Sequence, residues 1–228
     1  MKSAIATFRG TVGLVVLAFL ISSCAATRST LDLTVPRVEA PTGQTSVKLI
    51  EVNDRRSFEA NPRTPSVPSL QNAAEINDPA IRSRALARKR GGFGMAMADI
   101  LLPEGRTVEQ LVREAVTTAF RDRGYLVVDD TSPVNAKALP LSVDIRQFWS
   151  WFTPGFWAIS IEFEGIVILK SEALLINPEE TVRGYALARS MAATDGEWQR
   201  TMQQGIGDLI DKMKARIRRP EEVKSSAQ

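Results

Sequence analysis

Two long stretches of alternating apolar residues, on either side of a turn signal, constrain the fold of this chain more than any other feature. Apolar side chains share one face over residues 141–151, with Gln147 as an exception, and again over residues 157–169. Period-two alternation is typical of strands that bury one face. The Thr-Pro-Gly tripeptide at 153–155 lies between the stretches, and Pro-Gly suits the central pair of a type II turn. The pattern predicts a long β-hairpin.

Two capping boxes mark the main helices. Residues 107–110 (Thr-Val-Glu-Gln) open a helix that Gly124 ends, and a strand follows at 125–128. Residues 194–197 (Thr-Asp-Gly-Glu) open a second helix that runs to Ile217. The sequence therefore predicts two amphipathic helices of several turns each.

Shorter signals complete the order of elements. Further strands are predicted at 47–52, 93–102 and 181–192, and a Pro-rich loop at 59–79. Asp78-Pro79 is predicted to open a short helix that Gly91 ends. The resulting fold class is α/β (α+β): one domain over residues 47–219, with a mixed, largely antiparallel sheet and two main helices packed on it.

The N-terminal segment has the pattern of a secretory signal. Lys2 and Arg9 precede ten apolar or small residues at 12–21, a run too short to span a membrane. The small pair Ser22-Ser23 then precedes Cys24, the only cysteine of the chain. Residues 1–23 are therefore predicted to be a signal peptide. A buried core cysteine at position 24 is the alternative.

Ile21-Ser22-Ser23-Cys24 resembles the lipobox of bacterial lipoproteins. This resemblance implies that Cys24 carries acyl chains, which anchor a protein stably when there are two or more. It also implies a lipid-anchored protein of the bacterial cell envelope. If the host has two membranes, Ala25 after the cysteine fits the family's sorting pattern for the periplasmic face of the outer membrane. Residues 24–46, rich in Thr, Ser, Pro and Ala, are predicted to be a flexible tether reaching about 70 Å. Residues 220–228 are predicted to be disordered.

Composition excludes several function classes. Without residues 1–23 the chain has 27 basic and 26 acidic residues, so no sustained basic surface for nucleic acid is expected. The chain has no histidine, which removes Ser-His-Asp triads and His-containing metal sites. With Cys24 acylated, no free thiol remains. No metal, cofactor or catalytic residue is predicted.

Aromatic residues crowd the predicted hairpin tip. Six of the fifteen aromatic residues lie between Phe148 and Trp157. Trp149, Trp151 and Trp157 fit the inward face by parity, whereas the phenylalanines have the opposite parity. One sheet face cannot bury both sets unless the other face is also covered, and an exposed aromatic patch marks an interface. The predicted interface with a partner or membrane comprises Phe148, Trp151, Phe152, Phe156 and Trp157.

A second candidate surface is basic. The short helix predicted after Asp78 would carry Arg82, Arg84, Arg88, Lys89 and Arg90. A solvated face is one interpretation of this cluster. Contact with anionic lipid headgroups or an acidic partner is the other.

Two groups of carboxylates are the remaining candidates for chemistry. Asp54 follows a strand, where acids of active sites occur but turn-forming aspartates also occur. Glu162 and Glu164 lie two residues apart on one strand face, as paired glycosidase carboxylates or as solvated glutamates would. No partner base or nucleophile can be named for either group.

Beyond the lipobox, three segments resemble the YajG-like family of bacterial lipoproteins: residues 53–56 (NDRR), 88–94 (RKRGGFG) and 121–128 (RDRGYLVV). The resemblance covers residues 47–217. It implies an envelope location and a compact α/β domain, and it brings no catalytic residues. The Pro-rich segment at 59–79 is where this chain departs most from that pattern.

Three functions follow as hypotheses. The first is a non-enzymatic envelope lipoprotein that binds an envelope protein as an accessory or assembly factor. The second is a lipid or glycolipid transport accessory, which needs an apolar cavity near the aromatic tip. The third is a carboxylate-based hydrolase of envelope polysaccharide, which needs two carboxyl groups about 5–9 Å apart in a cleft.

Overall fold

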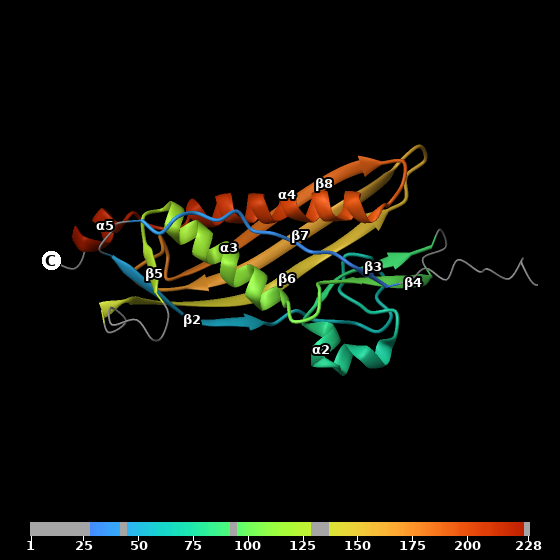
Figure 1. Ribbon diagram of the computed structural model, residues 1–228, viewed down its shortest axis with the longest axis horizontal. Coiled ribbons are helices and arrows are strands. Elements are labelled where there is room, and N and C mark those ends of the chain that lie inside the picture. The colour runs from blue at the N-terminus through green and yellow to red at the C-terminus, as the bar shows by residue number, and fades with distance from the viewer. Residues whose placement is uncertain (1–27, 42–44, 92–94, 129–136, 226–228) are drawn as a thin grey trace, which may run out of the picture.

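The long strand β6 (Leu139–Thr153) organises the sheet in the computed structural model, which describes residues 28–41, 45–91, 95–128 and 137–225. Along one edge, β6 pairs antiparallel with β7 (Ile159–Lys170), which pairs antiparallel with β8 (Glu179–Ser190). Along its other edge, β6 pairs in parallel first with β2 (Ser46–Asp54) and then with β3 (Ala85–Arg90). The predicted hairpin is therefore the centre of the sheet (Figure 1).

Three short strands complete the eight-stranded sheet. β4 (Ala96–Leu101) pairs antiparallel with β3, β1 (Ser29–Thr30) pairs in parallel with β4, and β5 (Leu126–Val128) pairs in parallel with β2. The predicted class is confirmed: a mixed sheet with long antiparallel pairings and two main helices.

The main helices, α3 (Val108–Asp122) and α4 (Asp195–Lys214), cover one face of this sheet (Figure 1). The capping box of α3 is confirmed in both directions, and Gly124 takes the left-handed φ of +91° after it. The second predicted box is only half formed. Thr194 accepts from the Glu197 backbone N–H, but the Glu197 carboxylate accepts from Arg200 instead of returning to the cap.

Two glycines let α4 approach the sheet closely. A Cβ on Gly205 of α4 would lie 2.1 Å from the Phe163 ring. A Cβ on Gly184 of β8 would lie 2.7 Å from the Leu209 Cα atom. The helix backbone therefore sits directly on β7 and β8, with its apolar face buried against the sheet.

A β-bulge reverses the side-chain parity of β6. The register with β7 shifts between Ile145 and Gln147, because Arg146 has no residue opposite it. Leu141, Val143 and Ile145 face the helices before the bulge, whereas Phe148 faces them after it. The expectation that Trp149 and Trp151 share the face of Leu141 is therefore wrong.

Both tryptophans instead belong to a second, smaller core on the opposite face of the sheet. Trp149 and Trp151 pack there with Leu70, Ala85 and Leu101. The predicted Pro-rich loop covers them: the Trp149 indole N–H donates to the Pro65 carbonyl at 3.1 Å, and Phe58 meets the indole edge-on. The loop also contains a 3₁₀ helix, η2 (Ala73–Asn77). Cover on both faces resolves the conflict of parities at the predicted hairpin tip.

The predicted tether is largely part of the fold. Ser29 and Thr30 form β1, and residues 31–38, here called the strap, run along the two helices (Figure 1). Leu31 and Leu33 are buried in the main core. Gln199 of α4 donates to the Asp32 carbonyl at 2.7 Å, and Thr118 of α3 donates to the Pro36 carbonyl at the same distance. Leu31, Leu33 and Val35 alternate with polar residues, which is a period-two signal of a half-buried extended segment. The prediction failed because the Thr-, Ser- and Pro-rich composition of residues 24–46 was given more weight than this short alternation.

The C-terminal prediction also needs correction. Residues 220–225, predicted to be disordered, form the short helix α5 (Pro220–Ser225). Val223 of this helix is buried in the main core. The last three residues lie outside the described part of the chain.

Candidate functional site

The predicted aromatic interface divides into a buried and an exposed part. Phe148 and Trp151 are buried, in the main core and the second core respectively. Phe152 is half-buried, edge-on to Trp198 of α4. Phe156 and Trp157 are 90% and 82% exposed. Phe148 and Trp151 therefore do not belong to an interface, and the placement of Trp157 on the inward face was wrong.

The exposed pair lies in the turn that joins β6 to β7. The rings of Phe156 and Trp157 meet edge-on, with their centroids 4.7 Å apart. Residue 155 must be glycine for this turn to close, because a Cβ there would lie 2.3 Å from the Ala158 carbonyl oxygen. The turn thus holds two large apolar rings out in water, an arrangement typical of a docking surface.

The predicted basic helix is mostly a strand. Asp78 caps a helix that begins at Pro79 as expected, but this helix, α2 (Pro79–Arg82), ends after one turn. Ala85–Arg90 then forms β3 because it pairs with β4 and with β6. Pairing to distant strands outweighed the local helix signal.

All five basic side chains of this cluster are half-buried. Arg82 and Arg84 donate to the carbonyls of Arg56 and Leu102, Arg90 donates to Ser69, and Lys89 pairs with Asp195 at 2.8 Å. Burial, together with the Arg90 charge, lowers the pKa of Arg88 from its usual value. The cluster mainly ties loops to the sheet and does not form an open basic face.

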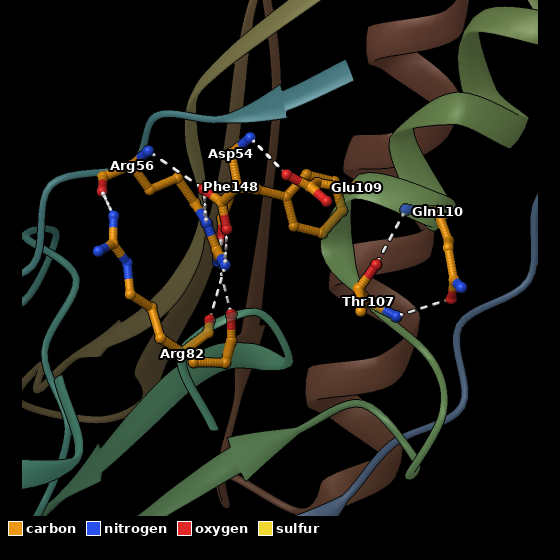
Figure 2. Close-up of polar contacts among 8 residues, drawn as sticks. Asp54, Arg56, Arg82, Thr107, Glu109, Gln110 and Phe148 are labelled. Carbon is orange, nitrogen blue, oxygen red and sulfur yellow. Dashed lines mark hydrogen bonds and ion pairs between the residues drawn. The ribbon is translucent and has the colours of Figure 1, made fainter. Parts of the chain in front are cut away.

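Asp54 is committed to a structural ion pair. Both carboxylate oxygens of Asp54 accept from the guanidinium of Arg56, at 2.9 and 2.7 Å. The same guanidinium donates to the backbone carbonyls of Arg82, Ala85 and Phe148, as Figure 2 shows. The Asp54 backbone N–H donates to Glu109 of α3 at 2.9 Å. This network holds the loop, the sheet and α3 together.

Glu162 and Glu164 are also engaged on the outer face of β7. Glu162 accepts from the Tyr185 hydroxyl at 2.6 Å and from Thr153 at 3.0 Å. Burial and the Glu162 carboxylate raise the pKa of Tyr185 to about 12. Glu164 forms an ion pair with Arg183. These contacts fit structural roles.

Two neighbouring cavities lie beside the strap, away from the aromatic turn. A cavity of about 380 Å³ is bordered by Leu33, Glu104 and Arg106, and one of about 330 Å³ by Pro36, Arg113 and Arg121. Both are open and partly charged. They are not the apolar cavity near the tip that a lipid carrier needs.

Cys24 lies outside the described residues, so its predicted acylation stays a prediction. Within residues 28–41, 45–91, 95–128 and 137–225, no cluster of three or more acidic side chains could hold a metal ion. In the same part of the chain, no helix is both long and apolar enough to cross a membrane.

Comparisons with known proteins give structural neighbours only. No family model matches the chain, and no curated protein matches it. An uncharacterised protein of known crystal structure shares 11% identity at a TM-score of 0.43, over 83% of this chain and 97% of the other. Protein XCC0632 from Xanthomonas campestris, of family DUF330, shares 11% identity at a TM-score of 0.40, over 82% and 92%. The YajG-like resemblance therefore stays a prediction.

The sequence did not indicate which exposed residues accompany Phe156 and Trp157. Met95 and Met97 flank the start of β4, and Met191 follows the end of β8; all three are exposed. Single methionines at strand ends give no periodic signal, so only the register of the sheet shows that they lie at one end.

Proposed function

We propose that this protein is a non-enzymatic lipoprotein of the bacterial envelope, anchored through acyl chains on Cys24, that binds an envelope protein as an accessory or assembly factor. The outer membrane, on its periplasmic face, is the proposed location. The YajG-like family is the proposed relationship.

The observation that carries this proposal is the position of the exposed aromatic turn relative to the start of the fold. Ser29 is fixed in the sheet by its pairing with Ile100. Cys24 is five residues earlier, which limits it to about 18 Å from Ser29. β4, which pairs with β1, and the β6–β7 turn, which contains Phe156 and Trp157, lie on the same side of the molecule (Figure 1). An anchor and an exposed apolar surface at one end suit a protein that works at a membrane surface.

The lipid-anchor part is tested by mass spectrometry of the chain purified from bacterial membranes. Cleavage before Cys24 together with the mass of a diacylglyceryl group and an N-acyl chain is expected. Cys24→Ser is expected to abolish both the processing and the added mass. A wild-type chain without added mass would contradict the proposal.

The partner-binding part is tested with photoreactive residues in native envelopes. Ile50 of β2 and Ile176 in the β7–β8 connection are half-exposed apolar residues far from the aromatic turn. A recurrent adduct with one protein from either position is expected, and Thr181, exposed on the outer face of β8, provides a polar comparison site. If neither position forms a protein adduct, the accessory role is wrong.

A further inference from the structure

Five large apolar side chains are exposed at one end of the sheet. Phe156 and Trp157 lie in the β6–β7 turn, Met95 and Met97 lie at the β3–β4 connection, and Met191 follows β8. Met95 is 68% exposed and Met191 is 84% exposed. Exposed apolar residues are normal when scattered, but a group of this size at one end indicates a contact surface.

The pairing of the strands places these residues at the same end of the sheet. β3 runs parallel to β6, with Ala87 opposite Ser150, so the chain after Arg90 and the chain after Thr153 leave the sheet at the same end. Ser190 pairs with Ile159, which brings the residue after β8 to that end as well. Figure 1 shows the ends of β3 and β8 and the β6–β7 turn on the same side of the molecule. These residues are here called the apolar end.

The segments that form the apolar end carry few charges. Residues 153–158 and 191–194 contain no charged residue. The exposed Arg189 precedes residues 191–194, and Asp195, which pairs with Lys89, follows them. An uncharged apolar tip suits the surface of a bilayer, and Arg189 beside it suits anionic headgroups.

The N-terminal segment leads toward this end. β1 runs parallel to β4, with Ser29 opposite Ile100 and Thr30 opposite Leu101. The described chain therefore enters the sheet at the end where β4 begins. Cys24 is limited to about 18 Å from Ser29 by the length of the chain, so an acyl anchor there holds the apolar end close to the bilayer.

We propose that the apolar end docks on the bilayer leaflet that holds the lipid anchor, with Phe156 and Trp157 in the headgroup region. This inference rests on the proposed acylation of Cys24. Trp157 suits that region because its indole ring combines an apolar body with a polar N–H at the boundary with water. Phe156 adds a second apolar ring beside it. The docked orientation leaves the opposite end of the sheet, with the β7–β8 connection, for protein partners.

A bilayer fits this surface better than a protein partner. The apolar residues project from three separate chain segments at the end of the sheet, and the cavities beside the strap are lined by other residues. The proposed acyl anchor on Cys24 keeps the protein beside lipid.

The test uses the mature, acylated chain in vesicles of phosphatidylethanolamine and phosphatidylglycerol. An environment-sensitive fluorophore is attached at Ala192→Cys, which is exposed beside Met191 and leaves all five apolar residues in place. Ile176→Cys, in the connection at the opposite end, is the matched control. Because Cys24 is the only native cysteine and is blocked by acylation, each variant offers one thiol.

The expected result is strong quenching of the Ala192 label by nitroxide lipids labelled near the headgroup, and little quenching of the Ile176 label. Phe156→Ser combined with Trp157→Ser is expected to reduce quenching at Ala192 markedly. Both rings are exposed, so this double variant should keep its unfolding midpoint.

Each contrary result has a distinct meaning. An acylated chain whose Ala192 label is quenched no more than the Ile176 label would overturn the docking proposal but leave the lipoprotein proposal standing. A Cys24 without acyl mass would overturn both. A label shielded from water in native envelopes but unquenched in vesicles would show that a protein covers this end instead.

Discussion

A single buried arginine fills the interval in the sheet where β6 changes neighbours. Asp54, the last residue of β2, pairs with Ile145, and the pairing of β3 with β6 is at Ser150. The Arg56 guanidinium donates to the Phe148 carbonyl within this interval and to the Ala85 carbonyl at the start of β3. Its charge is balanced by Asp54. One side chain thus substitutes for backbone pairing at the junction of two strands.

Arg56→Met is therefore expected to lower the free energy of unfolding by about 3–5 kcal/mol, because it leaves the Asp54 charge and the carbonyls without their donor. Urea unfolding followed by tryptophan fluorescence measures this. Arg55→Met is the control, since the Arg55 side chain is 60% exposed and 3.9 Å from Asp144, and it is expected to cost less than about 1 kcal/mol. Equal losses for the two variants would contradict the role of Arg56.

The buried phenol of Tyr125 makes the free energy of unfolding depend on pH in alkali. The residue is fully buried, and its hydroxyl donates to the Arg218 carbonyl at 2.9 Å. Burial raises the pKa of Tyr125 to about 12, from about 10 in an unfolded chain. Below pH 10 both states keep the phenol proton, and the stabilisation is fully present. Between pH 10 and 12 the Tyr125 phenol ionises in the unfolded state before it ionises in the folded state. The free energy of unfolding therefore falls by about 2–3 kcal/mol across this range.

Tyr125→Phe is expected to remove that part of the alkaline loss. The free energy of unfolding of wild type and variant is compared by urea unfolding at pH 9 and pH 11. The difference between the two proteins should shrink as the pH rises, because the variant has no phenol to ionise at this position. If the free energies of unfolding of the two proteins differ by the same amount at pH 9 and at pH 11, Tyr125 has an ordinary pKa.

At the scale of elements, the predictions that proved correct concern features set by residues close together in the sequence. The capping box of α3 and the Gly124 stop were confirmed because both depend on residues within one turn of each other. The bulge at Arg146 and the strand at Ala85–Arg90 were not predicted, because each depends on pairing with a distant strand. Within the candidate site, Phe156 and Trp157 were identified from their crowding, whereas Phe148 and Trp151 were misassigned by the parity reversal at the bulge.

Gly205 and Gly207 of α4 give a matched test of helix packing. Gly207→Ala meets no atom within 4 Å, so it is expected to stabilise the protein by up to about 1 kcal/mol through helix propensity. Gly205→Ala places its Cβ 2.1 Å from the Phe163 ring and is expected to destabilise by about 1–3 kcal/mol through overpacking. Thermal unfolding of both variants measures the difference. The same sign of change for both would show that α4 does not rest closely on β7.

At the scale of the whole molecule, the strap joins the two main helices into one layer. Leu33 is fully buried in the main core, and Thr34 accepts from Gln203 of α4. Leu33→Ala is therefore expected to cost about 2–5 kcal/mol, whereas a change in a flexible tether costs nothing. Asp32→Ala, at an exposed neighbouring position, is the control in the same urea titration. A neutral Leu33→Ala would restore the tether prediction.

The strap also determines how far the folded domain can move from a membrane. With Ser29 in the sheet, the linker from Cys24 reaches about 18 Å, against the roughly 70 Å expected if all of residues 25–46 were free. A short linker keeps the apolar end at a high effective concentration next to the bilayer, so the anchor and the tip residues should reinforce each other.

Lengthening the linker separates these two contributions. Insertion of about twenty Gly and Ser residues between Thr27 and Arg28 gives a linker with a root-mean-square length of about 25–30 Å. Quenching of the Ala192 label by headgroup nitroxides is expected to fall to an intermediate level, because Phe156 and Trp157 still favour the interface. Phe156→Ser and Trp157→Ser together with the insertion should bring it to the level of the Ile176 label. Unchanged quenching after the insertion would mean that the linker does not orient the domain, and complete loss with the native tip would mean that the aromatic pair has no affinity for the bilayer of its own.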